Sequence, residues 1–245
     1  MTVAIIISLI MVGLGFWQLE RADQKKQILS QQLIRAEQEA VNIATLINPI
    51  VNDHKTLRFR KVTARGEFLE EHTLYIDNQV HNSKVGFRLI TPFKFYISDE
   101  ILSEYVILVD RGWLPAGMSR KILPEFTKLV GVQTINGRLN VPFPQPPLWS
   151  DKYPIFDGLV WQFLPIEQFS EQTNLDVLPL VLELAPSRSD NSAPNVKLVP
   201  IVNWQIIDDE WVYKHQAYAF QWFSMSTVFF IACLIVLFKS LRKHK

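Results

Sequence analysis

The sequence predicts an α+β membrane protein in which two transmembrane helices flank a β-rich domain. Residues 2–19 and 217–238 contain no Asp, Glu, Lys, Arg or His. The first run is close to the roughly 20 residues that a helix needs to cross a bilayer, and the second is long enough. From about Leu57 the sequence pattern changes to short apolar segments separated by turn residues, which is typical of strands. These strands predict a mainly antiparallel sheet that is either barrel-like or a sandwich.

The first span is predicted to cover residues 1–19 and to continue as a helix to about residue 40. Residues 20–40 contain no Gly or Pro and are rich in good helix formers. A signal peptide is the alternative interpretation, but the apolar run has neither a preceding basic segment nor a clear small-x-small cleavage site. We therefore expect a membrane anchor.

The β-rich domain is predicted to occupy residues 41–212. Gly66 is expected to break one strand, and Asp77-Asn78 to form a turn. Arg111 is expected to fix a turn at a strand end before Gly112, with a buried ion-pair or stacking residue as the alternative interpretation. Residues 166–173 are expected to form a short helix. The proline-rich segment 141–147 is expected at an edge or in a polyproline loop, because proline lacks the ladder donor. The expected strands are 57–59, 62–64, 73–76, 85–95, 105–109, 132–139, 180–184 and 196–202.

The second span, residues 217–238, is followed by a basic tail over residues 239–245. This tail carries Lys239, Arg242, Lys243 and Lys245 and no acidic residue. Basic residues next to a span remain on the cytoplasmic side, so both termini are expected to be cytoplasmic and the central domain extracytoplasmic. The rule orients the first span less strongly, because basic residues also follow that span on its supposed outer side.

Composition and motifs argue against several functional classes. The formal net charge of +1 gives no indication of nucleic-acid binding. The single cysteine, Cys233, excludes a disulfide within the chain. The sequence contains no Gly-x-Ser-x-Gly, His-Glu-x-x-His, P-loop or Rossmann fingerprint, so we expect a protein that is not an enzyme. His54, His72 and His81 are interpreted as surface residues.

The entrance to the second span carries the most suggestive side chains. Trp211, His215, Tyr218 and Trp222 are spaced 4, 3 and 4 residues apart and share one helical stripe. Gln221 continues inward as a polar residue near hydrocarbon depth. Tryptophan and tyrosine are enriched at membrane interfaces, so an ordinary interfacial belt is the alternative to a ligand-binding stripe.

Trp17, Gln18 and Arg21 end the first span, at the depth where the second span begins. Two antiparallel helices would bring both sets together. Imidazole can bind haem iron, arginine can bind a propionate, and aromatic rings can cover the macrocycle. An imidazole that binds iron needs a hydrogen-bond partner for its second nitrogen, and Gln18 and Gln221 are the candidates for His215.

Four segments in register resemble the SURF1/Shy1 family of cytochrome c oxidase assembly proteins. Residues 15–21 with Lys25 resemble the first-span signature G-x-W-Q-x-x-R-x-x-x-K. Residues 66–68 and 86–93 resemble its G-E-F and G-F-x-x-x-T-P-F strand motifs. Residues 109–115 resemble V-N-R-G-W-V-P, with Asp110 in place of the usual Asn. Residues 215–223 resemble the second-span entrance H-x-x-Y-A-x-Q-W-F.

The resemblance implies a membrane protein that helps to build haem-copper oxidases and handles haem a, with His215 as the ligand of the haem iron. It implies cytochrome c oxidase subunit I, other oxidase assembly factors and membrane lipid as partners. The absence of a transit peptide favours a bacterial inner (plasma) membrane, with a multi-pass chain and a periplasmic domain. The expected cofactor-binding residues are His215, Arg21, Trp17, Gln18, Tyr218, Gln221 and Trp222.

Three other functions fit parts of the sequence. A haem-free structural chaperone would use the aromatic belt to dock oxidase subunits. An extracytoplasmic receptor would fit two spans around an outer domain, but only seven residues follow Phe238. A periplasmic hydrolase is disfavoured by the missing catalytic motifs.

Overall fold

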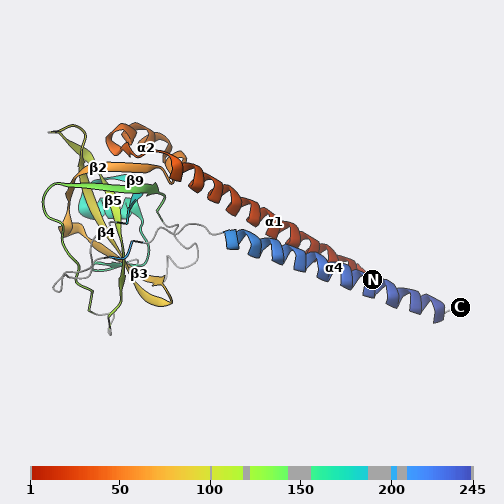
Figure 1. Ribbon diagram of the computed structural model, residues 1–245. Helices are drawn as coiled ribbons and strands as arrows, with labels where there is room; N and C mark the ends of the chain where they lie inside the picture. The colour runs from red at the N-terminus through yellow and green to blue at the C-terminus, as the bar shows by residue number, and fades with distance from the viewer. Residues whose placement is uncertain are drawn as a thin grey trace. The chain divides into compact units, whose positions relative to one another are not determined.

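The computed structural model describes residues 2–99, 101–117, 122–142, 156–186, 200–202 and 209–243 of the chain. The chain divides into two compact units: residues 1–34 with 205–245, and residues 35–204. The first unit contains helix α4 (Asp209–Lys243) and most of helix α1 (Thr2–Glu37), and the second is rich in strands (Figure 1). The domain end expected at residue 212 therefore falls inside α4.

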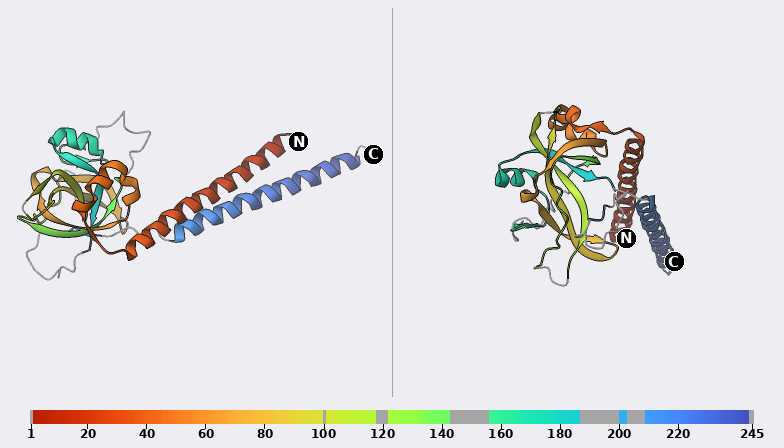
Figure 2. Two further views of the ribbon diagram at one scale, coloured as in Figure 1. Left: turned by 90° about the horizontal axis from the view of Figure 1, so that it is seen from above. Right: turned by 60° about the vertical axis from the view of Figure 1, so that its left-hand side comes forward.

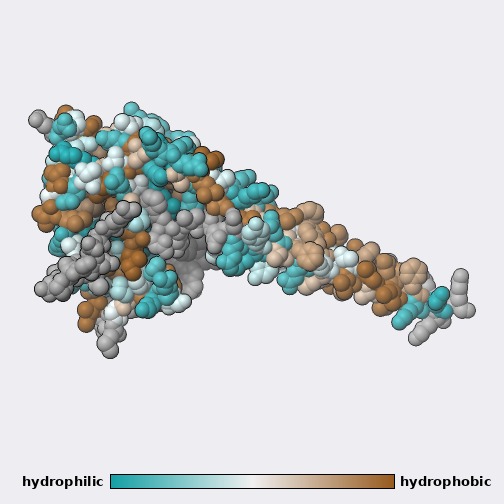
Figure 3. All heavy atoms as spheres, in the orientation of Figure 1, coloured by the Kyte–Doolittle hydropathy of each residue, from teal (hydrophilic) through white to brown (hydrophobic). Residues whose placement is uncertain are grey.

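Helices α1 and α4 lie side by side and antiparallel, with both chain termini at the same end of the pair (Figures 1 and 2). Both are long and apolar enough to cross a membrane. Hydrophobic side chains cover the middle of α4 on the face shown in Figure 3, and hydrophilic ones gather at its C-terminal end. The apolar runs read from the sequence thus form two membrane-type helices.

Buried residues at seven-residue intervals, all small except Val212, form the contact between the two helices. A strict seven-residue repeat keeps two helices in contact along a left-handed supercoil, and small side chains let the backbones approach closely. The Ser226 hydroxyl donates to the Ser8 carbonyl oxygen at 3.1 Å, and the Phe16 and Phe223 rings meet edge to face. The buried positions of this seam are Ser8, Gly15 and Ala22 on α1 and Val212, Ala219 and Ser226 on α4.

The strands of the second unit form one sheet that closes on itself. The order is β1-β2-β6-β9-β5-β4-β3-β8-β7, and an additional β2–β4 pairing closes the ring. Most pairs are antiparallel, but β1–β2, β3–β8 and β5–β9 are parallel. The architecture is therefore barrel-like. The strands are β1 (Val41–Asn42), β2 (Lys61–Phe68), β3 (Leu74–His81), β4 (Lys84–Tyr96), β5 (Leu102–Pro115), β6 (Gln133–Asn140), β7 (Phe156–Asp157), β8 (Val160–Trp161) and β9 (Asp176–Leu184).

Gly66 lies where the barrel closes, because it pairs with Gln133 of β6 and with Phe95 of β4. A Cβ atom at Gly66 would lie 2.2 Å from the Lys94 carbonyl oxygen. The expectation that Gly66 breaks a strand is wrong: β2 continues through it to Phe68. Glycine is needed here for close backbone approach rather than for chain termination.

Two layers of apolar side chains pack against the sheet. The interior cluster includes the fully buried Phe93, Phe95 and Ile107, together with Ile50 from helix α2 (Ile47–Asp53). The 3₁₀ helix η1 (Ile43–Leu46) adds to this interior. On the other face of the sheet, Phe169 of helix α3 (Ile166–Thr173) packs with residues of β3, β4, β5, β8 and β9.

The structure confirms some of the other predicted local elements and contradicts others. The expected strand at 57–59 is wrong, because the 3₁₀ helix η2 (His54–Leu57) ends at its first residue and a turn follows, in which Phe59 has a positive φ of 66°. Asp77-Asn78 lies at a register shift within β3 rather than in a turn between strands. The expected helix at 166–173 is confirmed. Most of the expected segments 141–147 and 196–202 lie outside the described residues, although Ile201 forms a bridge with Trp113.

Candidate functional site

A histidine and a glutamine face each other across the helix pair. The His215 Nδ1 atom lies 2.7 Å from the Gln18 Oε1 atom. Gln18 lies three residues after Gly15 in α1, and His215 lies three residues after Val212 in α4. Both side chains are half-buried, because they occupy the layer next to the small-residue seam. The helix pair therefore holds an interhelical hydrogen bond at the layer that the sequence singled out.

The direction of this hydrogen bond determines which imidazole nitrogen carries a lone pair. An amide oxygen can only accept, so Nδ1 of His215 must carry the proton when it bonds to Gln18 Oε1. In the neutral ring, Nε2 then carries the lone pair. A lone pair on Nε2 is what a metal ion needs from an imidazole ligand.

Trp17 and Arg21 lie one turn apart on α1. The Arg21 guanidinium carbon lies 5.7 Å from the centroid of the Trp17 ring, within the range of a cation–π contact. Arg21 also donates to Gln24 Oε1 at 3.0 Å. The Trp17 side chain is 48% exposed. The Trp17 ring and the Arg21 guanidinium therefore lie within one helical turn of Gln18 on α1.

The residues of α4 that were predicted to bind haem lie on two faces of the helix. Tyr218 is 53% exposed and Trp222 is half-buried, and both follow His215 along the predicted stripe. Gln221 is exposed and lies six residues after His215, which places it about 120° around the helix. The structure therefore brings Gln18, and not Gln221, to the His215 ring.

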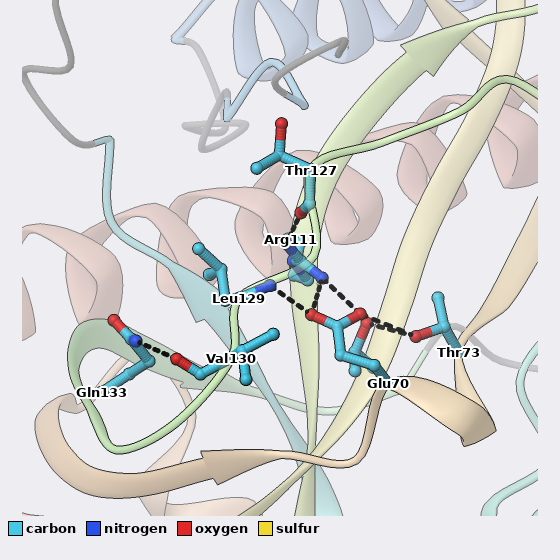
Figure 4. A network of polar contacts seen from close by, with 8 residues as sticks. Glu70, Thr73, Arg111, Thr127, Leu129, Val130 and Gln133 are labelled. Carbon is cyan, nitrogen blue, oxygen red and sulfur yellow. Dashed lines mark hydrogen bonds and ion pairs between the residues drawn. The ribbon is translucent and has the colours of Figure 1, made fainter. Parts of the chain in front are cut away.

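A second polar cluster lies in the β-rich domain, around Arg111 (Figure 4). Its guanidinium binds both carboxylate oxygens of Glu70, at 3.0 and 3.1 Å, and donates to the Thr127 carbonyl oxygen at 2.7 Å. The ring centroids of Phe68 and Phe126 lie 5.0 and 5.1 Å from the guanidinium carbon of Arg111. Arg111 is buried, and all of these contacts are within the domain.

Arg111 and Gly112 form a bulge inside β5 rather than a turn at a strand end. Gly112 pairs with Leu89 and Asp110 pairs with Ile90, so Arg111 is the extra residue between two consecutive partners. Gly112 has a φ of 118°, which favours glycine. The sequence prediction of a turn is wrong, although the structural role that it gave to Arg111 matches its contacts.

Asp110 adds a buried ion pair beside this bulge. Its carboxylate lies 3.0 Å from Arg88 Nε and accepts from the Gly112 N–H at 3.0 Å. Burial raises the pKa of Asp110 to about 6; Arg88 opposes the rise, Glu183 adds to it and the Gly112 hydrogen bond opposes it. Asp110 is therefore a structural acid whose charge depends on pH near neutrality.

Sequence reasoning missed a polar chain that crosses β6 and β9. Glu183 pairs with Arg138 and accepts from the Asn140 amide, and Asn140 in turn accepts from Arg58 Nε at 3.0 Å. Burial lowers the pKa of Arg58. The two residues of each contact are separated by 43 or more positions, so local patterns gave no signal for the contacts.

The three domain histidines are not gathered into one site. His72 lies 3.9 Å from Glu71, the His81 ring packs against Trp113 at 5.2 Å, and His54 begins η2. These separate placements leave His215 as the histidine of the helix-pair layer.

Comparisons with known proteins agree on one family. The SURF1 family model matches residues 5–227. A SURF1-like protein of Rickettsia bellii is 27% identical over 253 aligned positions, covering 96% of this chain and 87% of that protein. Surfeit locus protein 1 of Arabidopsis thaliana is 30% identical over 44% of this chain and 32% of its own length. The cytochrome oxidase assembly protein SHY1 of Saccharomyces cerevisiae is 25% identical over 47% of this chain and 27% of its own length.

Proposed function

Because the chain belongs to the SURF1 family, we propose that it is a membrane-anchored assembly factor for haem-copper (cytochrome c) oxidase that handles haem a. The yeast relative, which is named a cytochrome oxidase assembly protein, supports the assembly role. The two apolar helices support the membrane anchor. In this proposal the protein binds and passes on a cargo and does not catalyse a reaction. Its partners are cytochrome c oxidase subunit I, other assembly factors and membrane lipid.

The proposed location is a bacterial inner membrane, with both termini in the cytoplasm and the β-rich domain in the periplasm. The Rickettsia relative and the basic C-terminal tail support it. A reporter that fluoresces only in the cytoplasm should be bright after Lys245 and dark when inserted at Asn191. The reverse pattern would contradict the orientation.

The side chains of the helix-pair layer support the proposed haem handling. His215 offers one imidazole nitrogen while the other is bonded to Gln18. Arg21 offers a guanidinium for a propionate, and Trp17, Tyr218 and Trp222 offer aromatic surface. The exposure of Trp17 and Tyr218 leaves ring surface that a macrocycle can cover. Haem a would supply the iron that the imidazole binds.

The Gln18–His215 hydrogen bond is the observation that carries this proposal. A second-nitrogen partner is a regular feature of imidazole ligands, since it fixes both the tautomer and the ring orientation. Gln221 is not placed to bond to the His215 ring, because it lies on a different face of α4. We therefore propose His215 as the iron ligand and leave Gln221 outside the haem contacts.

Replacing His215 tests the proposal directly. His215→Ala should abolish co-purification of haem while leaving the protein in the membrane, because alanine supports the helix. Arg21→Ala should weaken haem binding less, since a charge near water is partly screened. Replacing His54, His72 or His81 should leave the haem spectrum unchanged. An unaltered wild-type spectrum in His215→Ala would exclude His215 as the ligand.

A haem-free structural chaperone is the second candidate. The same hydrogen bond supports it, because an interhelical Gln–His pair and an aromatic belt also stabilise two membrane helices without any cofactor. The haem spectrum of the purified wild-type protein separates the candidates. A protein that lacks haem but co-purifies with oxidase subunits would favour the chaperone.

A further inference from the structure

We infer that Gln18 is the positioning residue that presents Nε2 of His215 to haem iron and keeps this ligand weak enough for release. The inference rests on the proposed haem handling and specifies how its site is regulated. Its starting point is the 2.7 Å contact between Gln18 Oε1 and His215 Nδ1. This contact joins a residue of α1 to a residue of α4.

The seam residues on either side of the contact are buried on both helices. Gly15 and Ala22, the seam residues before and after it on α1, are both buried, and so are Val212 and Ala219 around His215. The seam brings the two backbones close on either side of the polar layer. Gln18 therefore reaches the ring of His215 from a supported position.

The acceptor that meets Nδ1 is a neutral amide. A carboxylate acceptor would draw the Nδ1 proton towards itself and raise the basicity of Nε2, which strengthens an iron–imidazole bond. Acidic side chains occur nearby on α1, at Glu20 and Asp23, but both are exposed and their spacing from Gln18 places them on other faces. An amide thus fixes the tautomer without the extra basicity, which suits a protein that must give its cargo up.

The two halves of the site come from different helices. The ligand nitrogen belongs to α4, whereas the group that selects its tautomer belongs to α1. Any change that separates α1 from α4 removes the acceptor from Nδ1 and frees the ring to rotate or to change tautomer. Haem retention is therefore coupled to helix pairing, and a partner that parts the helices would release the haem.

Nitrogen NMR of the haem-free, full-length protein in micelles tests the tautomer without any cofactor. The wild-type His215 ring should show a protonated Nδ1 and a bare Nε2. Gln18→Leu should lose this preference, and Gln18→Glu should keep it because a carboxylate still accepts. Gln27→Leu, an exposed amide on the same helix, is the control and should match the wild type. A protonated Nε2 in the wild type would overturn the inference.

Haem titration of the same proteins tests the effect on the ligand. Gln18→Leu should weaken haem affinity about 10- to 100-fold, as the loss of such outer partners does at metal sites. Gln18→Glu should release haem more slowly to an apoprotein acceptor and lower the haem midpoint potential. Equal haem affinity of Gln18→Leu and the wild type would overturn the role of Gln18 but leave the proposed function standing. A wild-type protein that binds no haem would contradict the proposed function.

Discussion

The β-rich domain and the helix pair bury different kinds of polar group. The buried charged residues among those described, which include Asp110, Arg111 and Glu183, all lie in the domain. The helix pair buries neutral groups instead: Ser8 and Ser226. Charges can be buried in the domain because each has a partner within hydrogen-bond distance. A membrane-type helix pair excludes them, because unpaired charge is costly in hydrocarbon.

This difference separates structural roles from functional ones. The ionic residues of the domain bond to one another and to loop backbone, as Arg111 does with Glu70 and Thr127, so their chemistry is used to hold the fold. In the helix pair, His215 keeps one ring nitrogen outside its hydrogen bond with Gln18. Variants in the domain should therefore alter stability, and variants in the polar layer should alter ligand binding.

The largest effect is expected for Arg111→Met. Removing the guanidinium leaves the largely buried Glu70 carboxylate without its cationic partner, which costs about 3–5 kcal/mol. Chemical denaturation of the full-length protein in detergent should reveal the loss. Arg65→Met is the matched control, because the exposed Arg65 also covers an aromatic ring, that of Tyr96 at 5.0 Å. A loss no larger than that of Arg65→Met would mean that the buried pair does not support the domain.

The second effect tests the bulge at Gly112. Gly112→Val should lower the free energy of unfolding by about 3 kcal/mol, since a positive φ costs a β-branched residue about 1–3 kcal/mol and a Cβ would meet the Ile201 carbonyl oxygen at 2.7 Å. Gly131→Val should cost only the backbone strain, without a steric clash, because Gly131 has a φ of 78° but open space around it. Gly117→Val, with neither feature, should be close to neutral. Similar melting temperatures for all three would contradict the assigned conformation.

Much of the fold was readable from local patterns, and the remainder depended on distant pairings. Uncharged runs predicted both helices, and short apolar segments between turn residues located most strands. Such segments do not show whether a sheet closes, so Gly66 at the β2–β4 closure was wrongly taken for the end of a strand. The parallel β5–β9 pairing likewise joins strands that no local signal connects.

The candidate site was partly readable for the same reason. Depth in the membrane placed Gln18 and His215 in one layer, because antiparallel spans bring equal depths together. Depth alone also admitted Gln221, whereas helical periodicity puts it on another face. The bulge at Arg111 was missed because a positive φ at Gly112 fits a turn and a bulge equally well.

The third effect tests the pH dependence that a buried acid gives the domain. The pKa of Asp110 is raised from 3.8 to about 6 in the folded protein, so its protonated form favours folding. This contribution is present below about pH 4 and is lost as the pH rises through 6, a change of about 3 kcal/mol. Asp110→Asn should therefore gain stability relative to the wild type by about that amount between pH 4 and pH 7. Denaturation curves with a constant difference between the two proteins would contradict the shift.

The smallest effect concerns the seam of the helix pair, where a side chain rather than a backbone atom is in the way. A Cβ at Gly15 would meet the Phe223 ring at 2.5 Å, whereas the space around Gly13 is open. The ring can turn aside, so Gly15→Ala should weaken helix pairing by only about 1 kcal/mol, partly offset by the better helix propensity of alanine. Hydrogen exchange of α4 amides should be faster in Gly15→Ala and unchanged or slower in Gly13→Ala. Equal exchange in the two variants would mean that the helices do not pack through Gly15, and the layer of Gln18 and His215 would lose its support.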